Sequence, residues 1–342
     1  MSTTWYFELA HTGFQKHRSL WDGIQVQRGN HVLLDSSFIQ LLLKHFGHRD
    51  VFVGVLDGHP AGMALIHKSR VGVWETFQPA QAPIGLALVD DVQWGQEVLL
   101  SLLRAVPGLA VQLSVLHQDP YYPGFGPVNS IPLIQQSDYI KTARIALSGS
   151  FDSYWQSREG RLRKNNDRLR RRMSEKGLAP EFVVIREPAN VAGAISEYGR
   201  LESKGWKSQQ GTAVSEKNDQ GRFYRDLLET FCERGEGSIF QLRINGQVVA
   251  SDLCLNRGET MVLLKTAYDE EWSAYSPAFL MREDVMRYLF ASGEITSYEF
   301  YGPLMDYQLR WTDQVRTLYH LTCFRHAWVR SAKNLVKRLR AS

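Results

Sequence analysis

One carboxylate stands out among the residues that could do chemistry. Asp252 interrupts the apolar run 248–255, which has the composition of a strand. Carboxylates are rarely buried, and one held in an apolar strand can act as a proton acceptor. The alternative is a structural aspartate, hydrogen-bonded at a strand end. Glu299, Tyr301 and Tyr307 lie on or beside neighbouring expected strands and are further candidates for proton transfer, although the tyrosines could equally be packing aromatics.

The common catalytic signatures are absent from the sequence. It contains no Gly-Lys-Ser/Thr phosphate loop, no Gly-x-Ser-x-Gly, no His-Glu-x-x-His and no dinucleotide glycine pattern. The ten histidines show no ligand spacing, and Cys232, Cys254 and Cys323 lie far apart in apolar surroundings. We therefore expect no metal site and no disulfide framework, and covalent serine chemistry is disfavoured.

The elements that must position these residues occur twice in the same order. Each copy is a helix, a strand, a tight turn and a second strand: 38–46, 51–56 and 61–66 in the first, and 223–231, 238–244 and 248–255 in the second. The turns are Asp57-Gly58 and Asn245-Gly246, which favour hairpins because these residues tolerate positive φ. Each copy continues into an apolar helix that ends near a glycine. The repetition predicts two copies of one α/β unit in tandem.

The repeat sets the expected domain boundary. We expect a first domain at 1–147 and a second at 148–342, and this length is sufficient for two separate cores. The fold class is α/β (α+β), with a mixed, largely antiparallel sheet flanked by helices in each domain. The counterpart of Asp252 in the first copy is Ala64, so we expect the second domain to carry the site and the first to be degenerate.

Several short motifs follow one another between 150 and 324. They are Arg161-Leu162-Arg163-Lys164-Asn165-Asn166, Gly205-Trp206-Lys207, Asn245-Gly246-Gln247-Val248-Val249-Ala250, Ala267-Tyr268-Asp269, Tyr275-Ser276-Pro277, Phe300-Tyr301-Gly302 and Tyr307-Gln308-Leu309-Arg310-Trp311. In this order the chain resembles the GNAT acyltransferase superfamily. It is most similar to the double-domain branch with the FemAB peptidyltransferases and CelD-like acetyltransferase domain proteins. Two positions differ: Ala278 stands where the family often has glycine, and Gln308 where it often has lysine.

The resemblance implies an N-acyltransferase that uses acyl-CoA, such as acetyl-CoA, and no metal. The acceptor would be an amine on a small molecule or glycan, such as an amino sugar or a polysaccharide or cell-envelope precursor. It implies catalytic roles for Asp252, Glu299, Tyr301 and Tyr307, donor contacts from Ser276, Pro277, Ala278, Phe279 and Gln308, and substrate contacts from Arg163, Lys164, Trp206, Lys265, Tyr268 and Trp311. A helix that starts near Ala278 would offer free backbone N–H groups to a pyrophosphate. Trp206 and Trp311 could instead be core residues, and Lys265 a solvated side chain.

A basic segment precedes these motifs. Eight arginines and lysines lie within 158–172 against Glu159 and Asp167, whereas the whole chain carries a net charge of only +4. Three interpretations stay open: a solvated helix face, a cleft in which Arg163 and Lys164 bind a phosphorylated donor or an anionic acceptor, and a tRNA-binding surface. The third follows from the resemblance, since FemAB relatives take their amino acid from aminoacyl-tRNA. A non-catalytic interaction module with the same fold is a further alternative.

The sequence also predicts a location. No apolar run approaches the roughly 20 residues that a membrane span requires, and the first 20 residues carry charges throughout and lack the apolar core of a signal peptide. We therefore expect a soluble, cytoplasmic protein without an integral membrane segment.

Overall fold

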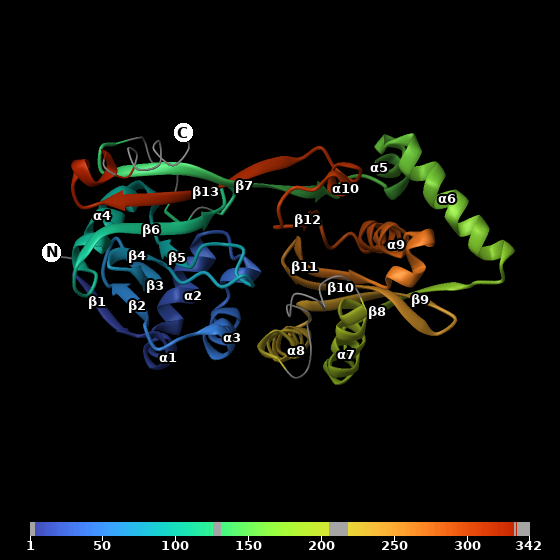
Figure 1. Ribbon diagram of the computed structural model, residues 1–342, viewed down its shortest axis with the longest axis horizontal. Coiled ribbons are helices and arrows are strands. Elements are labelled where there is room, and N and C mark those ends of the chain that lie inside the picture. Colours follow the sequence, from blue (N-terminus) through green and yellow to red (C-terminus); the bar gives the residue numbers. More distant parts are fainter. Residues whose placement is uncertain (1–3, 123, 126–130, 205–217, 332, 334–342) are drawn as a thin grey trace. The chain divides into compact units, whose positions relative to one another are not determined.

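The structure is a computed structural model of the 342-residue chain. It describes residues 4–122, 124–125, 131–204, 218–331 and 333. Internal contacts divide the chain into two compact units (Figure 1). Unit 1 consists of Met1–Lys141 and Arg316–Ser342, and unit 2 consists of Thr142–Val315.

Unit 1 is a mixed sheet in the order β1-β2-β3-β4-β6-β13-β7, with the short β5 paired to β3. Its strands are β1 (Trp5–Leu9), β2 (Val51–Leu56), β3 (Gly62–Arg70), β4 (Gly72–Thr76), β5 (Ala87–Val89), β6 (Ala110–Gln118), β13 (Val315–Phe324) and the first part of β7 (Ile134–Ala146). Its longer helices are α2 (Arg18–Gln27), α3 (Ser36–Phe46) and α4 (Gly95–Ala105), and α1 (Ala10–Gly13) is a single turn. Side chains such as Ile66, Leu99 and Val115 form a core between α4 and the sheet.

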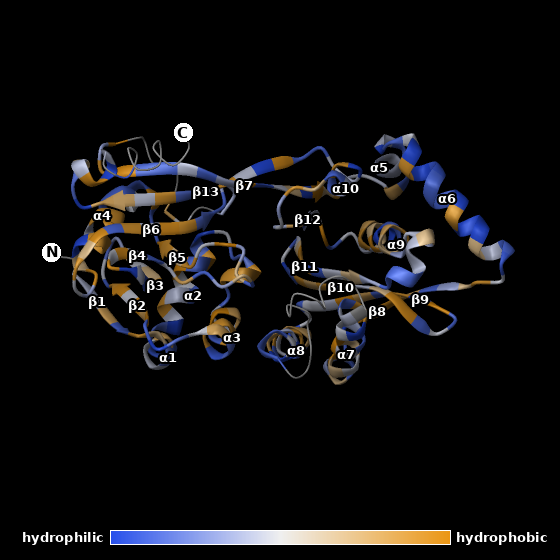
Figure 2. Ribbon diagram, in the orientation of Figure 1, coloured by the Kyte–Doolittle hydropathy of each residue, from blue (hydrophilic) through white to orange (hydrophobic). Residues whose placement is uncertain are grey.

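Unit 2 is a second mixed sheet in the order β7-β12-β11-β10-β9-β8. Its own strands are β8 (Pro180–Ile185), β9 (Gly237–Ile244), β10 (Gln247–Arg257), β11 (Thr260–Tyr268) and β12 (Ser297–Glu299). Helices α7 (Pro188–Lys204) and α8 (Asp219–Cys232) cover one face of this sheet. Helices α5 (Phe151–Ser157), α6 (Gly160–Glu175) and α9 (Pro277–Ser292) cover the other, and the turn α10 (Asp306–Leu309) follows β12 (Figure 1). Figure 2 shows strongly hydrophobic strands and a mostly hydrophilic α6.

The two units share one topology, which confirms the predicted fold class. In unit 1, β2, β3 and β4 form an antiparallel meander, and α4 then leads to β6, which is parallel to β4. In unit 2, β9, β10 and β11 form the same meander, and α9 leads to β12, which is parallel to β11. The Asn245-Gly246 turn has φ values of 52° and 79° and joins the paired residues Ile244 and Gln247, as a two-residue hairpin requires.

The division of the chain differs from the expected boundary after residue 147. The end of β7 pairs with β12 in unit 2, where Ala146 lies opposite Ser297. The last strand, β13, pairs antiparallel with β6 of unit 1, where Cys323 lies opposite Leu113. β7, which follows the repeat of unit 1, thus completes the sheet of unit 2. β13, which follows the repeat of unit 2, completes the sheet of unit 1. Strand patterns in a sequence show where a strand lies, but its neighbour is decided by contacts between residues far apart in the chain.

The basic segment does not form one continuous helix with the residues that precede it. α5 ends before Arg158, which has extended backbone angles, and its N–H donates to the Trp155 carbonyl. α6 then starts at Gly160, and the Glu159 carbonyl accepts from the N–H of Leu162 at 3.0 Å. The guanidinium of Arg158 donates to the carbonyl of Trp311 at 3.0 Å, so a contact distant in sequence accompanies the break.

Candidate active site in unit 2

Strands β11 and β12 stay together for only three residues. β11 pairs with β10 from Thr260 to Tyr268, but with β12 only from Thr260 to Val262. Beyond Val262 the two parallel strands therefore separate, and no other described strand pairs with β11 on that side. Three segments surround the point where β11 and β12 separate: the last part of β11, the start of α9 and the segment after β12. Most of the predicted site residues lie on these three segments.

Helix α9 begins without a capping side chain. Ser276 has left-handed backbone angles (φ 46°), its side chain makes no capping hydrogen bond, and Pro277 is the first helical residue. The first N–H groups of a helix have no partner within it, so the N–H of Ala278 faces out of the helix start. Together with the partial positive charge there, this geometry suits an anionic group.

The corresponding helix start in unit 1 is covered by the chain itself. A Cβ atom on Gly95, the first residue of α4, would lie 2.1 Å from the Phe125 carbonyl oxygen. Close by, the Val89 N–H donates to the Gly124 carbonyl at 3.1 Å. The two copies of the fold therefore differ at this place: the start of α4 lies against the backbone at Phe125, whereas the Ala278 N–H at the start of α9 makes no hydrogen bond with a described residue.

Asp252 lies in a closed, buried cluster on β10. Its Oδ1 accepts from the Thr266 hydroxyl at 2.6 Å, and its Oδ2 lies 2.9 Å from Nη1 of Arg282 on α9, although these two atoms are not aligned for a hydrogen bond. Arg282 also donates to Thr266 at 3.2 Å, and its guanidinium lies 5.0 Å from the centre of the Tyr298 ring. Burial raises the pKa of Asp252, while Arg282 and Thr266 oppose that shift. The structure thus gives Asp252 the partners of a structural carboxylate.

The other predicted catalytic residues differ in their access to solvent. Glu299 is fully buried on β12 and accepts from the Ser297 hydroxyl at 3.3 Å. Tyr301 is buried just after β12 and has a φ of 50°, a strained value for a tyrosine. Tyr307 on α10 is 39% exposed. Burial raises the pKa of Tyr307, the Arg282 charge lowers it and the Asp252 charge raises it. Among the predicted catalytic groups, Tyr307 therefore reaches solvent and also has a pKa that the charges of the buried pair Asp252 and Arg282 shift.

Gln308 has a local structural role that its family counterpart could not fill. Its side chain is buried, and its Oε1 accepts from the Met305 N–H at 2.7 Å, which caps α10. A lysine has no acceptor atom and could not make this bond. The family resemblance implies a contact between Gln308 and the acyl donor, whereas the side-chain amide of Gln308 is turned toward its own helix, α10.

The predicted substrate residues do not form one surface. Trp311 is a core residue that packs between Trp155 and Phe279, with ring centres 5.8 and 6.1 Å apart. Lys265 forms an ion pair with Glu202 at 3.1 Å. The remaining four are spread out: Tyr268 is 43% exposed, Lys164 is exposed, Arg163 donates to Gln156 at 2.6 Å, and Trp206 lies outside the described residues.

Helix α6 has one structural arginine among its basic residues. Its apolar row, Leu162, Leu169 and Met173, is buried in the core of unit 2. Arg170 donates to Asp284 of α9 at 2.7 Å and holds the two helices together. The exposed cations of the helix are Arg161, Lys164, Arg168, Arg171 and Arg172. Most of the basic side chains of α6 thus face solvent.

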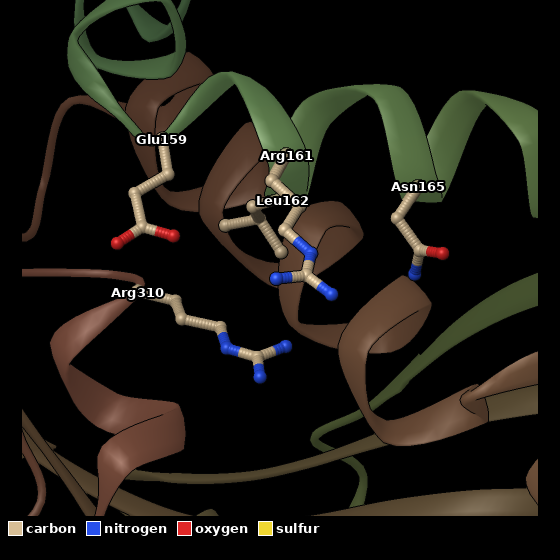
Figure 3. Close-up of a pocket in the computed structure, with 5 residues that line it drawn as sticks. All are labelled: Glu159, Arg161, Leu162, Asn165 and Arg310. Carbon is tan, nitrogen blue, oxygen red and sulfur yellow. The ribbon is translucent and has the colours of Figure 1, made fainter.

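A cavity of about 230 Å³ lies at the start of α6 (Figure 3). It is lined by Glu159, Arg161, Leu162, Asn165 and Arg310. Sequence reasoning missed this grouping and also missed Arg282. Arg282 left a signal, because it shares the buried helical row of Val285, Met286 and Leu289, where a charged side chain needs a buried partner. Arg161 and Arg310 left no such signal.

Two searches of the described residues gave negative results. No group of three or more histidine, cysteine, aspartate or glutamate side chains could hold a metal ion in that part of the chain. None of its helices is long and apolar enough to cross a membrane.

Part of the chain matches a known family model. Residues 160–309 match the family model of the acetyltransferase (GNAT) domain. No curated protein sequence matches the chain.

Solved structures with a similar fold span nearly the whole chain at low identity. One is the C-terminal domain (DUF2156) of a protein described as a lysylphosphatidylglycerol synthetase from Agrobacterium fabrum, with a TM-score of 0.58, 12% identity, and 91% of this chain and 92% of that chain covered. FemX has a TM-score of 0.53 at 11% identity, with coverages of 93% and 97%. L-PGS from Bacillus licheniformis has a TM-score of 0.51 at 14% identity, with coverages of 89% and 96%. Residues 160–309 are an acetyltransferase (GNAT) domain, and the chain has the FemAB-like double-GNAT fold.

Proposed function

We propose that unit 2 is an N-acyltransferase that moves an acyl group from acyl-CoA, with acetyl-CoA as the first candidate, to an amine. The observation that carries this proposal is the uncapped start of α9, set against the start of α4, which lies against the Phe125 carbonyl. The N–H of Ala278 and the positive end of α9 would hold the pyrophosphate of the donor. The acceptor favoured by the family resemblance is the amine of an amino sugar or of a polysaccharide or cell-envelope precursor.

Tyr307 is the residue to which we assign the proton transfer to the leaving group. The amine nitrogen attacks the thioester carbonyl and the C–S bond breaks. The thiolate takes up a proton from the Tyr307 hydroxyl, the new amide nitrogen loses a proton to water, and the Tyr307 oxygen regains a proton from water. Burial raises the pKa of the Tyr307 hydroxyl, so this group is protonated at neutral pH and can donate. Asp252 and Arg282 would act through Tyr307 as positioning residues, because both are buried and both act on its pKa.

A thermal-shift titration tests the donor. A ligand that binds only the folded state raises the melting temperature by mass action, with about 2.7 kcal/mol of added stability at a concentration 100 times the dissociation constant. We expect acetyl-CoA or a longer acyl-CoA to raise the melting temperature, and amines added afterwards to release free thiol. If no CoA compound shifts the transition, the acyl-CoA proposal is wrong.

The exposed cations of α6 favour one other function, aminoacyl transfer from tRNA. Lys164, Arg168, Arg171 and Arg172 lie on the solvent side of the helix, and such rows bind phosphates with strong salt dependence. If tRNA is the donor, binding should weaken steeply with salt. Changing these four residues to alanine should flatten the log–log slope by about 3, at roughly 0.7–0.9 per phosphate contact.

A matched control removes the same charge from unit 1. Its four substitutions to alanine fall on exposed residues: Arg49, Lys68, Arg70 and Arg104. Arg170 is kept in both variants, because its pairing with Asp284 is structural. Equal slopes for the two variants, or no tRNA binding by the unaltered protein, would remove the tRNA alternative.

A further inference from the structure

The cavity at the start of α6 brings two arginines together from distant parts of the chain. Arg161 lies in the first turn of α6, and Arg310 follows α10. Figure 3 shows both guanidinium groups pointing into the same space from opposite walls, with the amide nitrogen of Asn165 directed toward it. Leu162 forms the apolar part of the lining.

Neither guanidinium is neutralised by the residues that the structure describes. Arg170, Arg257 and Arg282 in the same unit each lie within 2.9 Å of a carboxylate oxygen. The guanidinium groups of Arg161 and Arg310, in contrast, make no hydrogen bond or ion pair with a described residue. Glu159 is the single acidic residue of the lining, so the cavity keeps a net positive charge. Two cations that share a small cavity repel each other, and an anion between them removes that repulsion.

The donor atoms suit a phosphate group. Each planar guanidinium can make two parallel hydrogen bonds to a tetrahedral oxyanion. The Oδ1 of Asn165 accepts from Arg168 at 2.9 Å, which fixes the amide and leaves Nδ2 as a third donor. A volume of about 230 Å³ holds a phosphate and a few attached atoms, but it is below the range that encloses a whole cofactor-sized ligand.

The cavity also adjoins the proposed donor site. The Arg310 guanidinium lies 5.4 Å from the centre of the Phe279 ring, and Phe279 is the third residue of α9. A substrate held at the start of α9 could therefore reach the cavity with a charged end.

We propose that Arg161 and Arg310 bind a phosphate monoester group of one of the two substrates of unit 2. That group is either the 3′-phosphate of a CoA donor or a phosphate on the amine acceptor. The role of the bound molecule rests on the proposed function, whereas the recognition of phosphate by these two arginines does not.

Isothermal titration with paired probes tests the proposal. The pairs are acetyl-CoA with acetyl-3′-dephospho-CoA, and glucosamine 6-phosphate with glucosamine, and each is titrated into the unaltered protein and into the variant R161Q/R310Q. We expect the phosphorylated member of one pair to bind about tenfold more weakly to the variant, since charged hydrogen bonds are involved. Its unphosphorylated partner should bind both proteins equally, and the pair that responds identifies the source of the phosphate.

The control variant R171Q/R172Q removes the same charge from the exposed face of α6, away from the residues that line the cavity. An equal loss of affinity in the control would overturn the proposal, because general charge would then explain binding. Equal affinity of R161Q/R310Q and the unaltered protein for every phosphorylated probe would also overturn it, as would a lack of binding by the unaltered protein. If glucosamine 6-phosphate binds through the arginines while acetyl-CoA does not bind, the phosphate site stands and the acyl-CoA function fails.

Discussion

Asp252→Asn is expected to lower the stability of unit 2 by about 3–5 kcal/mol, the cost of leaving one member of a buried ion pair without its partner. Arg282 is itself buried and lies 2.9 Å from Asp252. Asparagine can still accept the hydrogen bond from Thr266, but it cannot balance the guanidinium charge. Thermal or urea unfolding, followed by a signal from unit 2, measures the loss. A purely catalytic aspartate would leave the melting temperature unchanged.

The double variant D252N/R282M separates charge from packing. Methionine fills part of the volume of the arginine and removes the uncompensated charge, so the double variant should be more stable than D252N alone. If D252N unfolds like the unaltered protein, the ion pair contributes nothing and Asp252 becomes free for a catalytic role. If D252N is destabilised and the double variant is not recovered, removing the unpaired charge gains no more than is lost with the packing of Arg282 against Tyr298.

Local patterns predicted the strands of unit 2 well. Strands β9 (Gly237–Ile244) and β10 (Gln247–Arg257) agree to within two residues with the ranges 238–244 and 248–255 expected from the sequence. The two-residue turn at Asn245-Gly246 also has the predicted backbone angles. Alternating apolar residues and turn glycines act within a few residues, so they can be recognised without knowledge of the fold.

Features that depend on distant contacts were not predictable in this way. The pairing of β13 with β6 joins Cys323 to Leu113, and nothing local to either residue marks the other. The site residues behave similarly, because the character of Asp252 is decided by Arg282, which lies on a helix 30 residues later in the chain. Sequence reasoning found the unusual carboxylate and left a catalytic and a structural role open, since its charged partner was not visible.

The second large effect is expected from Ala278→Asp. Ala278 is the second residue of α9, where an acidic side chain favours the helix by about 0.3–1 kcal/mol through its dipole. The same carboxylate would face the pyrophosphate of a donor bound at the helix start. At about 4 Å the repulsion is on the order of 4 kcal/mol before salt screens it. We therefore expect an unchanged or higher melting temperature without ligand, and at least about tenfold weaker binding of acetyl-CoA by titration.

The repeat provides an internal control for this experiment, Gln96→Asp. Gln96 is the second residue of α4, so the substitution places the same charge at the equivalent helix start in unit 1. That start is covered by the backbone at Phe125, so Q96D should bind acetyl-CoA as the unaltered protein does. If Q96D rather than A278D weakens binding, the donor site lies in unit 1. If neither variant does, the donor is held away from both helix starts, and the difference between α9 and α4 has no bearing on function.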